Sequence, residues 1–133
     1  MELVAHKPED GIYSSTPDYI HAVEAVGARR QLFVTGTMGL DISGHPVDGI
    51  DAQLEMIWRN IGRILKAGSM TEDNIVHVRS FLTDRSRADS NARYRMQALQ
   101  GRPVAVTTVI VATLDPAWLV EIEVMAVDAV VIF

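Results

Sequence analysis

Cysteine is absent from this chain of 133 residues, and its absence excludes several kinds of chemistry at once. Disulfides, thiolate metal sites and a cysteine nucleophile all require that side chain. The histidines do not replace it, because no two have the spacing of metal ligands and none stands in a recognisable nucleophile arrangement. The four are His6, His21, His45 and His77. The sequence therefore predicts no metal site and no catalytic triad.

Long apolar runs and surplus basic charge are also missing. No run approaches the ~18 apolar residues of a membrane span, and residues 1–20 carry four acidic side chains without the continuous apolar core of a secretory signal. The formal net charge of −5 would repel a phosphate backbone. We therefore expect a cytoplasmic protein that binds neither a membrane nor nucleic acid.

What is present is an ordinary globular composition, with 48% apolar and 22% charged residues. A chain of this length can bury a core of its own. The sequence predicts one domain over residues 1–133.

Two apolar segments between Arg102 and Val127 organise the chain. Residues 104–113, VAVTTVIVAT, are uncharged and mostly β-branched, which predicts a strand buried on both faces. A breaker at 114–117 contains Pro116, which cannot lie in a central strand. Residues 118–127, WLVEIEVMAV, alternate and predict a second strand.

Two carboxylates share one face of that second strand. Glu121 and Glu123 lie on the side of Leu119 and Met125. Burying a carboxylate without a partner or water costs several kcal/mol. This face therefore either lines a cleft or an interface, or is a solvated sheet face.

The remaining elements include two helices. Apolar residues spaced by three and four predict a helix over Ile50–Ala67, capped by Asp48 or Asp51 and ended by Gly68. A second helix, Arg87–Gln100, would bury the stripe Ala88, Ala92, Met96 and Leu99.

Further strands are predicted at Leu3–His6 and Asn74–Leu82. Residues 20–25 and 31–35 read as the two strands of a hairpin that turns at Gly27–Arg30.

This order predicts an α+β fold with a single mixed β-sheet and two helices on one face. The other sheet face, which includes Glu121, then has no cover within one chain. An uncovered face with apolar residues on several strands must find a partner or aggregate. We therefore expect a closed homo-oligomer with any cleft between subunits.

Short motifs in this order resemble the reactive intermediate deaminase family, also called the RidA or YjgF-like family, across residues 19–127. The motifs are Tyr19–Val23, Leu32–Gly36, Phe81–Asp84, Asn91 with Tyr94, Arg102–Pro103, Thr107–Val109 and Val120–Glu123. The resemblance implies a fold like that of the trimeric chorismate mutases. Three subunits pack their sheets around a central barrel and bind ligands in the clefts between neighbours.

Members of that family that act as enzymes hydrolyse reactive enamines and imines to keto acids and ammonia without metal or cofactor. Older family labels speak of a ribonuclease or translation inhibitor. Carried onto this chain, the resemblance puts Tyr19, Asn91 and Thr108 in the substrate cleft and makes Glu121 the residue that positions the attacking water.

Position 106 departs from the family. Fifteen residues before Glu121, where active deaminases have an arginine that grips the substrate carboxylate, this chain has Val106. Valine offers none of the charge-assisted hydrogen bonds of a guanidinium. Arg79 is the candidate replacement, the alternative being that it snorkels at the sheet edge or pairs with a carboxylate.

Three other residues have open roles. Glu121 is a water-positioning base or a structural carboxylate of the trimer channel. Tyr19 lines the cleft or only packs, and Trp118 stacks on a flat ligand at the cleft rim or only packs.

Three functions remain. The first is a metabolite-binding trimer that takes a non-standard carbonyl, imine or enamine ligand and hydrolyses it. The second is a binding or regulatory module without turnover. The third, a ribonuclease, is opposed by the net charge and the lack of paired histidines. The apolar tail Ala129–Phe133 either extends the last strand or seals a subunit contact.

Overall fold

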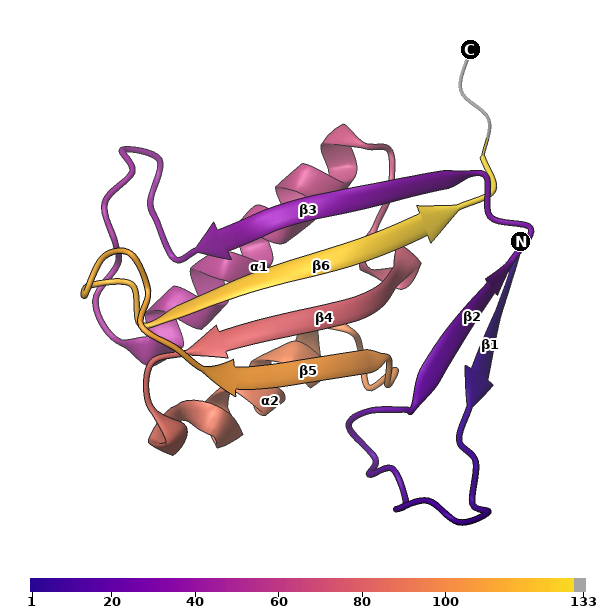
Figure 1. The fold of residues 1–133 in the computed structure, drawn as a ribbon. Coiled ribbons are helices and arrows are strands. Elements are labelled where there is room, and N and C mark those ends of the chain that lie inside the picture. The colour runs from indigo at the N-terminus through magenta and orange to yellow at the C-terminus, as the bar shows by residue number, and fades with distance from the viewer. Residues whose placement is uncertain (131–133) are drawn as a thin grey trace.

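The computed structural model describes residues 1–130 and has the α+β architecture that the sequence predicts (Figure 1). The main sheet has four strands in the order β3-β6-β4-β5. They are β3 (Arg30–Met38), β4 (Ile75–Leu82), β5 (Ala105–Ile110) and β6 (Val120–Asp128). Because β4 and β5 pair in parallel while the other pairs are antiparallel, the sheet is mixed, as predicted.

Two helices, α1 (Ile50–Ala67) and α2 (Ala88–Ala98), lie on one face of this sheet (Figure 1). Single 3-10 turns precede β4 and α2, at Glu72–Asn74 and Arg85–Arg87 respectively. No helix within residues 1–130 covers the opposite face of the sheet. No helix of that part of the chain is long and apolar enough to cross a membrane.

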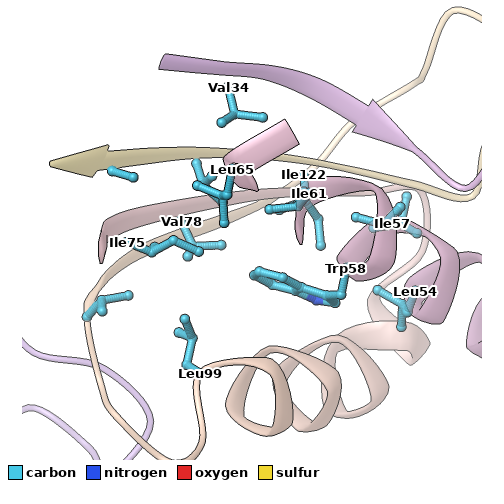
Figure 2. Packing of buried hydrophobic residues seen from close by; sticks show 14 of the residues in the cluster. Val34, Leu54, Ile57, Trp58, Ile61, Leu65, Ile75, Val78, Leu99 and Ile122 are labelled. Atoms are coloured by element: carbon cyan, nitrogen blue, oxygen red, sulfur yellow. The ribbon is translucent and has the colours of Figure 1, made fainter. Parts of the chain in front are cut away.

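The core lies between the sheet and α1 (Figure 2). The alternation predicted for β6 is confirmed, because Val120, Ile122, Val124 and Ala126 are buried while the residues between them are half-buried. Trp58, Ile61 and Leu65 of α1 pack against that face, as the helical spacing predicts. This packing fixes which side of β4 and β6 faces the helices.

The bounds of α1 are those predicted, and Gly68 follows its last residue. The predicted N-terminal cap is wrong: the cap residue is Gly49, with φ 90°, and no side chain caps the helix. Glycine reaches a positive φ at little cost, so the chain enters the helix through a backbone conformation that aspartate would adopt less readily.

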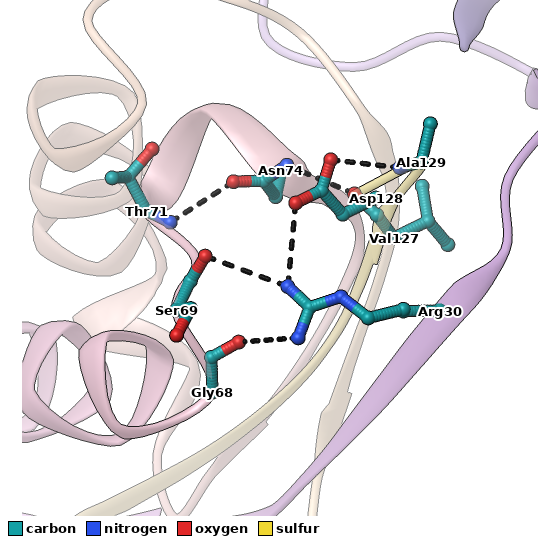
Figure 3. A network of polar contacts seen from close by, with 8 residues as sticks. All are labelled: Arg30, Gly68, Ser69, Thr71, Asn74, Val127, Asp128 and Ala129. Carbon is teal, nitrogen blue, oxygen red and sulfur yellow. Dashed lines mark hydrogen bonds and ion pairs between the residues drawn. The ribbon is translucent and has the colours of Figure 1, made fainter. Parts of the chain in front are cut away.

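The predicted hairpin of residues 20–25 and 31–35 is wrong. β2 (Ala22–Val26) pairs with β1 (Glu2–His6) in a separate two-stranded sheet, whereas β3 pairs with β6. Arg30, the first residue of β3, contacts residues of other elements (Figure 3). Its Nη1 donates to the Gly68 carbonyl at 2.9 Å, and its Nη2 lies 3.3 Å from Asp128 Oδ2.

The strand predicted at 104–113 is shorter, and it is not buried on both faces. β5 is an edge strand with β4 as its one neighbour, and its last four residues are exposed. Its β-branched residues signalled a strand, but they do not distinguish a central position from an edge. The strand predicted from Trp118 begins at Val120 instead.

The buried face of α2 differs in part from the prediction. Leu99, just past the helix, is buried as predicted, but the helical residues buried with it are Asn91 and Arg95, whereas Ala88 is exposed. Sequence reasoning chose the more apolar stripe. The helix instead turns polar side chains inward, towards a hollow in the protein surface.

Candidate functional site

The hollow lies between α2, β5 and the segment 13–19 and has a volume of about 460 Å³. It brings together four residues that the family resemblance assigned to the cleft: Tyr19, Asn91, Val106 and Thr108. Its other lining residues are Tyr13, Asp18, Ala88, Asp89, Ala92 and Arg95. We call this space the α2–β5 hollow.

The pleat of β5 decides which of its residues reach the hollow. Val106 and Thr108 pair in register with Val78 and Ser80 of β4, both fully buried on the helix side of the sheet. Side chains of one strand alternate between faces, so Ala105 and Thr107 point the other way. Position 106 therefore faces the helix side, as an arginine there would.

Backbone contacts close the third side of the hollow. The Ile20 amide donates to the Val104 carbonyl at 3.0 Å, which ties the segment to the entry of β5. His21 Nε2 donates to the Tyr13 carbonyl at 2.9 Å, so the segment folds back on itself. The Tyr19 ring lies edge-on to His21, with centroids 6.2 Å apart. These contacts hold Tyr19 at the hollow.

Arg95 supplies the positive charge of the hollow. Its side chain is 3% exposed, and its Nη2 donates to Asp18 Oδ2 at 2.8 Å. Burial lowers the pKa of the Arg95 guanidinium, while the charge and hydrogen bond of Asp18 raise it. Thr16 Oγ1 donates to the other oxygen of Asp18. The guanidinium is therefore already matched by a carboxylate of the same chain.

Asn91 places a buried polar atom without a partner at the hollow. The residue is 1% exposed, and its Oδ1 has no hydrogen-bond partner among residues 1–130. The same is true, within that range, of Arg95 Nε. A buried polar atom without a partner costs about 1–3 kcal/mol. Groups left in this state are expected where a ligand completes the hydrogen bonding.

Glu121 lies on the opposite face of the sheet. It pairs in register with Phe81, on the side that the helices leave uncovered. The β3–β6 pairing has a bulge between Val34 and Thr37, and the Glu121 side chain lies across it. A Cβ at Gly36 would stand 2.9 Å from Glu121 Cδ, so glycine makes room for the carboxylate.

Arg79 is also on the uncovered face and is paired. Its Nε lies 2.5 Å from Glu123 Oε1, directly across the β4–β6 ladder. Of the alternatives that the sequence left open, the carboxylate pair is the one present. Burial, helped by the charge of Arg79 and opposed by that of Glu123, lowers the pKa of neighbouring His77. Arg79 and Val106 therefore do not meet within one protomer.

Trp118 is half-buried in the loop that leads into β6. Its carbonyl accepts a hydrogen bond from Thr113 Oγ1 at 2.7 Å, and its amide donates to the Asp115 carbonyl. It does not line the α2–β5 hollow. Within residues 1–130, no group of three or more His, Asp or Glu side chains is arranged to hold a metal ion.

Sequence reasoning missed Arg95, Asp18 and Asp89 as residues of the hollow. Arg95 received no role from the sequence, although it follows Asn91 by one helical turn. That i, i+4 spacing was the available signal. Asp18 and Asp89 carried none, because only the fold brings segment 13–19 against the helix.

This arrangement defines a class: an α+β protein whose mixed sheet carries two helices on one face and a polar hollow beneath the second helix. The family model described as endoribonuclease L-PSP matches residues 14–128, and the chain belongs to this family, the Rid or YjgF family. Position 106 lies within the matched region.

Solved structures agree with this assignment. YyfB of Yersinia pestis, described as a protein of the conserved Rid family, is 26% identical with a TM-score of 0.79, over 96% of this chain and 99% of that one. Rv2704 of Mycobacterium tuberculosis, a member of the YjgF/YER057c/UK114 family, is 32% identical with a TM-score of 0.65, over 83% and 86%. RidA of an Antarctic Psychrobacter shares the fold at 24% identity and a TM-score of 0.70, over 92% and 98%. No protein with curated annotation matches the chain.

Proposed function

We propose that this protein binds a small carbonyl, imine or enamine metabolite in the α2–β5 hollow and hydrolyses it. The observation that carries the proposal is the buried, unpartnered Oδ1 of Asn91, which lines the hollow together with Tyr19 and Thr108. These groups offer hydrogen bonds to a small polar ligand. A volume of about 460 Å³ admits one.

Catalysis by Glu121 requires a second copy of the chain. Glu121 and Val106 lie on opposite faces of one sheet, so the Glu121 carboxylate reaches the hollow only from a neighbouring subunit. The uncovered face favours assembly, because it exposes Phe33 at 72% and Val109 at 40%. The resemblance to trimeric family members implies the same arrangement.

The reaction balances without a cofactor. Water adds to the carbon of a C=N bond as Glu121 accepts one of its protons, and that proton passes to nitrogen to give a carbinolamine. The remaining hydroxyl proton is then transferred to nitrogen, the C–N bond breaks, ammonia leaves and the carbon becomes a carbonyl. The protein's part is to orient the ligand and to hold the water.

A binding module without turnover is the second candidate, and a specific observation favours it. Within residues 1–130 of one protomer, the acidic side chains of the hollow are Asp18, held by Arg95, and exposed Asp89, and neither is buried as a tuned general base would be. If no carboxylate of a neighbour enters the hollow, the ligand is bound but not hydrolysed.

Ammonia release from a panel of imines generated in situ separates the two candidates. Glu121→Gln keeps the shape and removes the base, so we expect a loss of about 10²–10⁴-fold in turnover. Glu123→Gln is the matched control, because it changes the next carboxylate on the same strand face. Binding with no ammonia from the wild-type protein would establish the module instead.

Light scattering tests the assembly on which catalysis depends. A trimer would have a mass of about 44 kDa, three times the 14.6 kDa of the chain. A monomer at every concentration would leave Glu121 without access to the hollow and would contradict hydrolysis by this route.

A further inference from the structure

The side chains that line the α2–β5 hollow carry a net negative charge. Its titratable carboxylates are Asp18 and Asp89, and its one guanidinium is that of Arg95. The formal charge of the lining in one protomer is therefore −1. Val106 adds nothing where the active family members are expected to carry a second positive charge.

The one positive charge of the hollow is already paired with a carboxylate of the same chain. Arg95 Nη2 donates to Asp18 Oδ2 at 2.8 Å, and Asp18 is held in place by Thr16. An incoming carboxylate would have to displace this internal carboxylate and would gain only the difference between two similar ion pairs. The arginine therefore neutralises the hollow more than it attracts a ligand.

The helix does not restore an anion site. The N-terminal turn of α2 favours negative charge, but Asp89 stands in that turn. Within residues 1–130, two buried atoms of the hollow lack a partner: Arg95 Nε, which belongs to the guanidinium already paired with Asp18, and Asn91 Oδ1, an acceptor that calls for a donor such as N–H. Glu121 of a neighbouring copy, if it enters as proposed above, adds a further negative charge.

We propose that the substrate of this site carries no carboxylate. It is a neutral or cationic compound, namely an imine, an amide or a carbonyl compound derived from an amine, and its N–H donates to Asn91 Oδ1. This inference rests on the proposed function and narrows its substrate class. A 2-imino acid, with its carboxylate beside the reacting carbon, is excluded by like-charge repulsion and by the missing anchor. The amine-derived imine of the same size is accepted.

The test compares two probes of the same size, pyruvate and pyruvamide, in which a neutral amide with N–H donors replaces the carboxylate, by calorimetric titration of the assembled protein at low salt. We expect pyruvamide to bind at least about tenfold more tightly. Val106→Phe, which fills the hollow, should abolish binding of both and so locates the site. Asp89→Asn and Asp18→Asn should reduce the preference for pyruvamide over pyruvate. Asp10→Asn, which removes an exposed carboxylate outside the hollow, should leave that preference unchanged.

Each result is decisive. Equal or tighter binding of pyruvate would overturn this inference and leave the proposed function standing. A preference for pyruvamide that neither Asp89→Asn nor Asp18→Asn alters would also overturn it, because charge would not be the cause. If neither probe binds and no imine of the panel releases ammonia, the proposed function fails and the inference fails with it. Since Asp18→Asn removes the partner of a buried arginine, the exposed Asp89 provides the variant that keeps the fold.

Discussion

The ion pair of Arg95 with Asp18 should contribute measurably to stability, and Asp18→Asn tests it. The change leaves a guanidinium that is 3% exposed without its carboxylate. Removing one partner of a fully buried pair costs about 3–5 kcal/mol. The Asp18 side chain is 42% exposed, so water from the hollow can partly replace it. A hydrogen bond to a charged group is worth about 1.5–3 kcal/mol, and we expect a loss of about 1–2 kcal/mol.

Urea unfolding followed by circular dichroism measures this loss. For a chain of this length the same change lowers Tm by about 4–8 °C. Arg95→Met should cost less than Asp18→Asn, because it removes the buried charge itself and keeps most of the volume. In the double variant the cost of Asp18→Asn should largely disappear. Asp10→Asn is the control for an exposed carboxylate.

A free energy of unfolding unchanged within about 0.3 kcal/mol in Asp18→Asn would refute the pair. The pair would also be refuted if Asp18→Asn lowered the free energy of unfolding by as much in the Arg95→Met variant as in the wild-type protein. Either result would mean that Arg95 is free to bind an anion, and the charge argument for the hollow would lose its basis.

Three further predictions concern other elements. Arg30→Met removes the bonds to the Gly68 carbonyl and to Asp128 and should cost about 1–2 kcal/mol in urea unfolding; no loss would contradict the anchoring of β3. Gly36→Ala places a Cβ 2.9 Å from Glu121 Cδ and should lower ammonia release while circular dichroism shows the fold retained; unchanged release would separate Glu121 from turnover. Because burial lowers the pKa of His77, the folded protein binds fewer protons than the unfolded chain, and stability should fall as the pH drops below about 6.5. His77→Gln should reduce this loss of stability at low pH. If the pH dependence were unchanged in that variant, other groups would be its cause.

Periodicity predicted the parts of the fold that bury apolar residues. The bounds of α1 and the inward side of β6 followed from spacing, because each element packs one apolar stripe into the core. The partners of β2 and β3 did not follow. Each of these strands pairs with a strand far from it along the chain, β2 with β1 and β3 with β6, which periodicity within a strand does not reveal.

The candidate site was predictable only where a motif marked it. Tyr19, Asn91, Val106 and Thr108 were named from the family resemblance, and the structure brings them to one hollow. Periodicity misread α2, because a helix that lines a polar hollow turns Asn91 and Arg95 inward rather than its more apolar stripe. Their roles in binding stay predictions.

Hydrolysis, as proposed, needs the hollow of one copy and Glu121 of the next. Complementation tests this most directly. The Asn91→Ala and Glu121→Gln variants are each expected to be inactive alone. They are then co-expressed, so that the two chains mix in one assembly. If a site takes its hollow from one chain and its carboxylate from another, about a quarter of the sites regain both groups and about a quarter of the wild-type ammonia release returns. If each site lies within a single chain, the mixture will be no more active than the two variants alone.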